Sequence, residues 1–292
     1  MAENSRVASK QPLIAYFLLT FFITWTCWIT SILLMSQNGY PIPSIYNVVG
    51  RLENGYTNAE HQGLAFLFLC GTWGPMIAAV IVIAFRDGKA GLVDLLKRVF
   101  NFRFAWYWYP IILGVPLVGV LFMVGASGLA GNDLSKIFRF NTSAWIIVVV
   151  FLNQIVTSGL EEPGWRGFAT PEFQKFRNAE DSGFYIGMIW GIWHFPFIIY
   201  LNLSTGNTNA YLIGLQLFGY VMLMAPMGII TVWMYNNTRS VGLLILSHAV
   251  NNFIPFLFGN NIIDVSGGFI VAITSWVRSE ERRVGKECRS RW

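Results

Sequence analysis

Long apolar segments dominate this sequence and limit what the chain can fold into. A transmembrane helix needs about 20 mostly apolar residues. Eight candidate segments occur along the 292 residues, over 12–35, 62–85, 106–130, 143–160, 183–201, 210–234, 241–258 and 262–277. The sequence therefore predicts an all-α polytopic membrane protein with eight transmembrane helices.

The composition supports a single transmembrane domain. Charged residues make up only 12% of the chain and hydrophobic residues 54%, whereas soluble proteins carry about 25% charged residues. We therefore predict one domain over residues 1–277, with its functional core at about 140–260. The three cysteines, Cys27, Cys70 and Cys288, suggest neither a disulfide framework nor a paired-cysteine metal site.

The last fifteen residues, Arg278 to Trp292, differ abruptly from the apolar segment before them. At all fifteen positions they match the translation of a common sequencing adapter, so we interpret 278–292 as a sequencing artefact and not a domain. The tail has six basic and three acidic residues, so without it the net charge of +5 falls to +2. We expect no nucleic-acid partner, and the true C-terminus beyond about 277 is left open.

Lysine and arginine are unevenly distributed between the loops. With the N-terminus inside, the segments 1–11, 86–105, 161–182 and 235–240 hold eleven of them, against three in the loops of the other side. Since basic residues favour cytoplasmic loops, we predict a multi-pass cell-membrane protein with both termini in the cytoplasm.

The segment 86–105 has its own pattern. Four apolar residues share one helical face, with Lys97 and Arg98 off it: Leu92, Leu95, Leu96 and Val99. The pattern predicts an amphipathic helix along the cytoplasmic membrane surface, and an ordinary loop helix is the alternative.

Several polar residues lie in or beside the apolar segments of the second half, where charged groups are costly and mark function by default. In the stretch "GLEEPGWRGF", Glu162 and Arg166 are four residues apart and can pair on a helix. Asn153, Thr157 and Glu161 follow one another at four-residue steps and predict a polar stripe. Glu161 is then left without an obvious local partner, which makes it the candidate base.

Two later segments add histidines. Gly183, Gly187 and Gly191 form a small-xxx-small ladder that lets another helix approach closely, and His194 follows on the same side. His248 and Asn252 are four apart and share a helical face.

Each feature has a structural explanation, such as a solvated helix border or a packed histidine, but their convergence favours one site. Peptide hydrolysis needs an activated water, a group that stabilises the oxyanion and a proton donor. Glu161 with His194 could activate the water, and His248 with Asn252 could bind the oxyanion. Glu161, His194 and His248 would also make a three-ligand zinc set, although no H-E-x-x-H motif is present. Whether Zn²⁺ is used stays open, and no other cofactor is expected.

The ordered motifs resemble the CPBP intramembrane proteases, which include the CAAX prenyl endopeptidases and bacterial Abi-type proteins linked to bacteriocin immunity. The matching stretches are Glu161-Glu162-Pro-Gly-Trp-Arg166 with the W-R-G-F continuation to Phe168, then Trp190-Gly-Ile-Trp-His194, then His248-Ala-Val-Asn-Asn252. The resemblance covers residues 60 to 277, and Trp190 stands where the family usually has phenylalanine.

The resemblance implies a CAAX-protease-like bundle of eight helices with a conical cavity. It implies that Glu161 and His194 activate water and that His248 and Asn252 form the oxyanion site. Glu162, Arg166 and Trp190 would be supporting residues. It implies a glutamate-type mechanism more than a metal-dependent one, although the family has long been labelled metal-dependent.

The leading hypothesis is therefore an intramembrane endopeptidase acting on a peptide or membrane-protein substrate, prenylated or not, within the lipid bilayer. One alternative is a non-catalytic immunity or scaffold protein of the same fold. Another is a proton-coupled transporter in which the buried Glu and His relay protons. Substrate identity, proteolytic competence and oligomeric state are not determined by the sequence.

Overall fold

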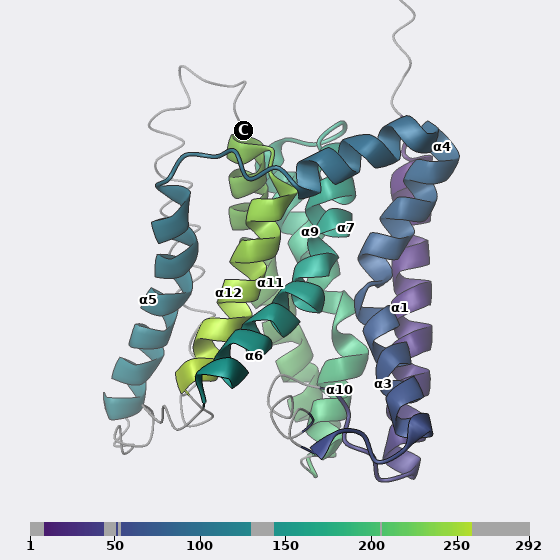
Figure 1. Cartoon of the computed structure of the whole chain (residues 1–292), viewed down its shortest axis with the longest axis vertical. Coiled ribbons are helices and arrows are strands. Elements are labelled where there is room, and N and C mark those ends of the chain that lie inside the picture. The colour runs from purple at the N-terminus through teal and green to yellow at the C-terminus, as the bar shows by residue number, and fades with distance from the viewer. Residues whose placement is uncertain (1–8, 44–50, 52–53, 130–142, 205, 259–292) are drawn as a thin grey trace, which may run out of the picture.

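The protein is a bundle of helices (Figure 1). The computed structural model describes residues 9–43, 51, 54–129, 143–204 and 206–258, and every regular element within these ranges is helical. The main helices are α1 (Gln11–Gln37), α3 (Ala59–Thr72), α4 (Gly74–Val99), α5 (Trp108–Leu129), α6 (Ala144–Val156), α9 (Ala179–Trp193), α10 (Phe195–Ser204), α11 (Ala210–Thr238) and α12 (Val241–Phe258). The all-α prediction is confirmed. The expected eighth span at 262–277 and the segment 278–292 lie outside the described residues.

Length and apolar composition mark several of these helices as membrane-spanning. Three helical stretches are each long and apolar enough to cross a membrane: α1, Ala144–Phe173 and α11. Two bent pairs meet the same criterion only when each pair is taken as one span: α3 with α4, bent by 59°, and α9 with α10, bent by 42°. The described residues therefore hold three to five spans by this criterion, while α5 and α12 contribute shorter apolar helices. The multi-pass prediction is confirmed, and the count of eight is approximate.

Both bends occur beside a proline. Pro75 occupies the first turn of α4, directly after the break at Trp73, and Pro196 follows the break at His194. Proline lacks the backbone N–H that would continue the helical hydrogen bonds, so a helix tends to end or bend there. His194 consequently lies at the end of α9 and not in the middle of a straight span.

The glycine ladder of α9 packs against α11, as predicted. A methyl group added to Gly183 would lie 2.6 Å from the Cα of Ile229, and one on Gly191 would lie 2.8 Å from the Cα of Val221. At Gly187 the added carbon would overlap the main-chain oxygen of Met224. The two backbones touch at these points, so only glycine fits there.

A kink divides α4 into two parts. Gly88 has φ 61° and ψ −152° inside the helix, a conformation that glycine adopts far more readily than other residues. Beyond it, the helix runs across one end of the bundle (Figure 1). Leu95 is buried there and Leu92 and Val99 are partly buried, but Leu96 is exposed. The helix is confirmed, but Leu96 does not pack on the protein with the other three apolar residues. Its place along the membrane surface stays a prediction.

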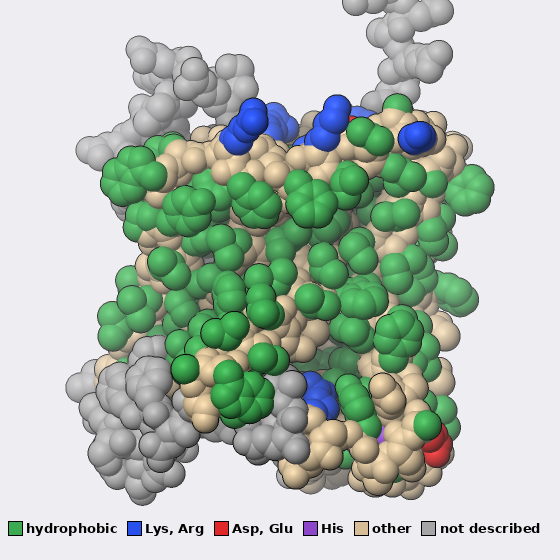
Figure 2. Space-filling view, in the orientation of Figure 1, with side chains coloured by type: hydrophobic (Ala, Val, Ile, Leu, Met, Phe, Trp, Pro, Cys, Tyr) green, Lys and Arg blue, Asp and Glu red, His purple; other side chains and the backbone are tan. Residues whose placement is uncertain are grey.

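The surface fits a protein that crosses a membrane. Hydrophobic side chains cover the body of the bundle, while lysine and arginine side chains gather at the end where α4 crosses it (Figure 2).

Candidate active site

The segment that carries both glutamates changes helix type several times. α6 ends at Val156, and Thr157 has φ −86° and ψ −90°. The chain continues as the 3₁₀ turn η3 (Ser158–Glu161), α7 (Glu162–Gly164), the π turn η4 (Trp165–Ala169) and α8 (Thr170–Phe173). π-helical turns are rare and occur often at functional sites.

The break at Thr157 corrects one prediction. The stripe Asn153–Thr157–Glu161 requires an uninterrupted α-helix, and α6 stops before Thr157. The Thr157 hydroxyl instead donates to the main-chain oxygen of Asn153 at 2.7 Å. The polar residues that do reach the site from this region are Gln154 and Ser158.

Glu162 and Arg166 form the predicted ion pair. Arg166 Nη1 lies 3.0 Å from Glu162 Oε1, and the two side chains are 0% and 1% exposed. Arg166 also donates two hydrogen bonds to Thr231 Oγ1 on α11, at 3.0 and 2.7 Å. Its guanidinium carbon lies 4.5 Å from the ring centroid of Trp190. A buried ion pair is tolerated only when further contacts satisfy the charges, and these contacts serve that purpose.

His248 reaches the same carboxylate from α12. Its Nδ1 lies 2.8 Å from Glu162 Oε1, the oxygen that Arg166 also contacts. Because a carboxylate only accepts hydrogen bonds, Nδ1 carries a proton. Glu162 therefore joins α12 to the glutamate segment, a contact that the sequence did not reveal.

Glu161 has a different kind of partner. Its Oε2 accepts a hydrogen bond from Trp190 Nε1 at 3.0 Å, and the residue is 4% exposed. Because Trp190 belongs to α9, 29 residues away, this contact is compatible with the prediction that Glu161 has no partner nearby in the chain. The same indole packs edge-to-face on His248, with ring centroids 5.3 Å apart. Trp190, the departure from the family's phenylalanine, is thus a hydrogen-bond donor to the candidate base.

His194 is held by the main chain of α9. Its Nδ1 lies 2.8 Å from the carbonyl oxygen of Trp190. Since a carbonyl oxygen can only accept, Nδ1 carries the proton in the neutral ring and Nε2 keeps its lone pair. Across the described part of the chain, no hydrogen bond joins His194 to Glu161. Trp190 contacts both, through its indole and its carbonyl.

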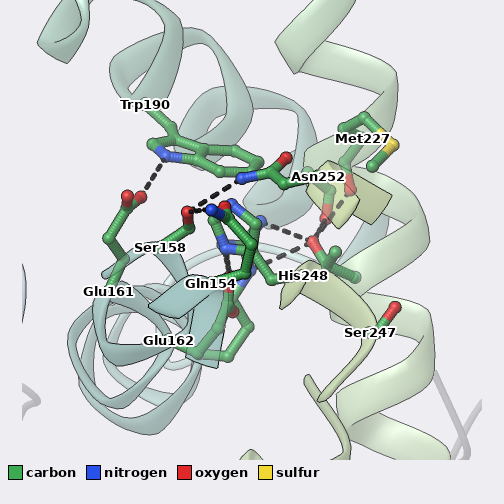
Figure 3. A network of polar contacts seen from close by, with 12 residues as sticks. Gln154, Ser158, Glu161, Glu162, Trp190, Met227, Ser247, His248 and Asn252 are labelled. Carbon is green, nitrogen blue, oxygen red and sulfur yellow. Dashed lines mark hydrogen bonds and ion pairs between the residues drawn. The ribbon is translucent and has the colours of Figure 1, made fainter. Parts of the chain in front are cut away.

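A polar chain fixes Asn252. Its Nδ2 donates to Ser158 Oγ at 2.9 Å, and Ser158 donates to Gln154 Oε1 at 3.2 Å. Figure 3 shows these three residues beside Glu161, Glu162 and His248. Gln154 and Ser158 were missed in the sequence, although their four-residue spacing could have indicated a shared face.

The structure does not bring the three possible zinc ligands, Glu161, His194 and His248, together. Among the residues that the structure describes, no group of three His, Cys, Asp or Glu side chains is placed to hold a metal ion. Glu161 contacts Trp190, His194 contacts the Trp190 carbonyl and His248 contacts Glu162. These side chains do not fit a shared metal in this arrangement, and no reaction step is derived through one.

These features define a class: a multi-pass membrane protein in which two buried carboxylates meet partly buried imidazole and amide groups of α9 and α12. Residues 143–254, which contain all of these groups, match the model of the Rce1-like type II CAAX prenyl endopeptidase family. The chain is also 28% identical to CAAX prenyl protease 2 of Methanococcus maripaludis, over 81% of this chain and 81% of that protein. The two matches confirm the family resemblance seen in the motifs.

Proposed function

We propose that the chain is an intramembrane endopeptidase in which Glu161 and His194 activate the attacking water. The contrast between the two glutamates carries this proposal. Glu162 faces Arg166 and His248, and its Oε2 is buried without a hydrogen bond from any described residue. Among the residues that the structure describes, Glu161 accepts a hydrogen bond from the neutral indole of Trp190 alone, so its second oxygen stays available as a proton acceptor.

In the proposed reaction, Glu161 takes a proton from water while the hydroxide forms a bond to the peptide carbonyl carbon. His194 accepts a hydrogen bond from the water at Nε2, the nitrogen that its main-chain contact leaves open. The C–N bond then breaks, and the leaving amine takes up the proton that Glu161 held. General acid–base groups of this kind accelerate a reaction by about 10²–10⁴-fold.

Asn252 and His248 stabilise the oxyanion. Asn252 uses one N–H on Ser158 and keeps the second for the substrate oxygen. Because Nδ1 of His248 already faces Glu162, this ring donates from Nε2 in its doubly protonated form. Hydrogen-bond donors fixed before the reaction stabilise developing charge without rearrangement.

The proposed substrate is a peptide bond of a membrane-associated protein or peptide, with prenylated C-terminal tails as the first candidates given the relative's name. No resident metal or other cofactor takes part in this proposal, and nucleic acid is not a partner. The basic end of the bundle is placed in the cytoplasm with both termini, following the distribution of lysine and arginine.

Cleavage by the purified protein in proteoliposomes tests the proposal, with a farnesylated CAAX peptide as probe and a comparison of membrane peptidomes alongside it. Glu161→Gln keeps the size of the side chain but cannot take a proton, so we expect a loss of about 10²–10⁴-fold. Glu60→Gln is the matched control, because Glu60 is exposed and its carboxylate accepts hydrogen bonds from Asn38 and Tyr40, away from the candidate site.

Four outcomes would count against the proposal. Full cleavage by Glu161→Gln would show that this carboxylate is not the base. A cellular function that survives Glu161→Gln without any cleavage would favour the non-catalytic immunity or scaffold function. Charge-dependent uptake without a product peptide would favour a transporter. Loss of cleavage on adding a chelator would overturn the metal-free mechanism.

A further inference from the structure

The second part of α4, residues 89–99, presents a second apolar stripe beside the one that packs on the protein. Val93, Leu96 and Phe100 are 39%, 55% and 68% exposed, and their spacing places them on one side of the helix. Lys89 and Lys97 lie along the same side and are also exposed. This side of the helix, defined by these five residues, is the outer face of α4.

The outer face carries unpaired positive charge. The acidic residues on either side of the kink at Gly88 are already engaged, Asp87 with Arg86 at 2.6 Å and Asp94 with Arg98 at 2.9 Å. Lys89 and Lys97 form no ion pair with any residue that the structure places. Lysine side chains can lay their methylene groups along apolar surface while the amine reaches outward.

The position of the second part of α4 indicates which part of the membrane it contacts. Its first part, Gly74–Arg86, belongs to a bent span, and after the kink at Gly88 the helix crosses the end of the bundle (Figure 1). It therefore lies where a span leaves the membrane. An apolar stripe bordered by lysines at that level suits the boundary between acyl chains and anionic headgroups.

The inner side of the same helix packs directly on the glutamate segment. Arg98 Nη1 donates to the main-chain oxygen of Gly167 at 2.5 Å and to Tyr235 Oη at 2.8 Å. A methyl group added to Gly167 would lie 2.6 Å from Leu95 Cδ1. Gly167 directly follows Arg166 in the π turn. Any force that holds α4 in place therefore also holds the turn that carries Arg166.

We propose that the outer face of α4 binds the anionic phospholipid headgroups of the surrounding bilayer, and that this binding stabilises the π turn Trp165–Ala169. The binding itself is independent of the reaction. Its consequence for catalysis rests on the proposed protease function.

Hydrogen exchange measured by mass spectrometry in nanodiscs tests the proposal without any substrate. The protein is compared in phosphatidylcholine alone and in phosphatidylcholine mixed with phosphatidylglycerol. The anionic lipid should slow exchange in residues 89–99 and in the π turn by up to about 30-fold, the effect of two lysines near an anionic surface. In the double variant Lys89→Gln/Lys97→Gln this response should disappear.

The matched control removes two exposed cations from elsewhere, Lys10 before α1 and Arg177 after α8. Lys10→Gln/Arg177→Gln should keep the lipid response. Equal exchange in both lipids, or an equal loss of response in this control, would overturn the proposal. If the lipid response is present and no peptide is cleaved, the headgroup site stands and the proposed function fails.

Discussion

Replacing Arg166 with methionine tests how strongly the buried ion pair supports the glutamate segment. The substitution removes the contact to Glu162, both hydrogen bonds to Thr231 and the charge over the Trp190 ring. Glu162 would keep only His248 as a partner at Oε1. Its other oxygen already lacks a hydrogen bond from any residue that the structure describes, so the carboxylate charge would be poorly compensated.

The expected cost is large. Removing one partner of a buried ion pair destabilises a protein by about 3–5 kcal/mol. A difference of that size changes the unfolding equilibrium constant by roughly 10²–10⁴-fold. Thr231→Val leaves the ion pair in place. It removes a hydroxyl that accepts from Arg166 and donates to main-chain oxygens of its own helix, so it should cost about 1–3 kcal/mol.

The double variant Glu162→Gln/Arg166→Met separates charge from packing. It removes both charges, so it should be more stable than Arg166→Met alone, although the contacts to Thr231 and Trp190 are still lost. The free energy of unfolding is measured by SDS titration in mixed micelles, with tryptophan fluorescence as the signal. The reasoning fails if Arg166→Met costs no more than Thr231→Val, or if the double variant is no more stable than Arg166→Met.

Two further predictions concern helix packing and the oxyanion site. Gly187→Ala should destabilise the protein by about 1–3 kcal/mol because the added methyl group meets the α11 backbone. The control is Gly219→Ala, where nothing lies within 4 Å of the added carbon. Equal unfolding free energies of the two variants in the same titration would contradict the packing. Ser158→Ala removes two hydrogen bonds that position Asn252, so at about 1 kcal/mol each kcat should fall by up to about 30-fold. KM should stay unchanged, and the control Ser247→Ala, beside His248 but outside this polar chain, should keep wild-type kinetics. A change in KM with kcat unaltered, or an equal loss of kcat in the control, would exclude the positioning role.

Local and periodic features of the sequence were sufficient for much of the fold. Apolar segments of sufficient length become helices in a membrane because no water is present to satisfy the backbone otherwise. The pairing of Glu162 with Arg166 follows from helical spacing, and the close approach of another helix to α9 follows from three glycines at four-residue steps, although only the structure shows that this helix is α11. These predictions hold because each depends on one helix and its own periodicity.

The polar contacts between helices were decided by the tertiary structure alone. His248 meets Glu162 across 86 residues and Trp190 meets Glu161 across 29, and both contacts depend on how α9 and α12 are rotated about their axes. Because α6 ends at Val156, the predicted stripe does not continue through Thr157. Ser158 contacts Asn252 instead. Sequence identified the polar residues at membrane depth and the pairing of Glu162 with Arg166, whereas helix packing determined that His248 also faces Glu162 and that Trp190 donates to Glu161.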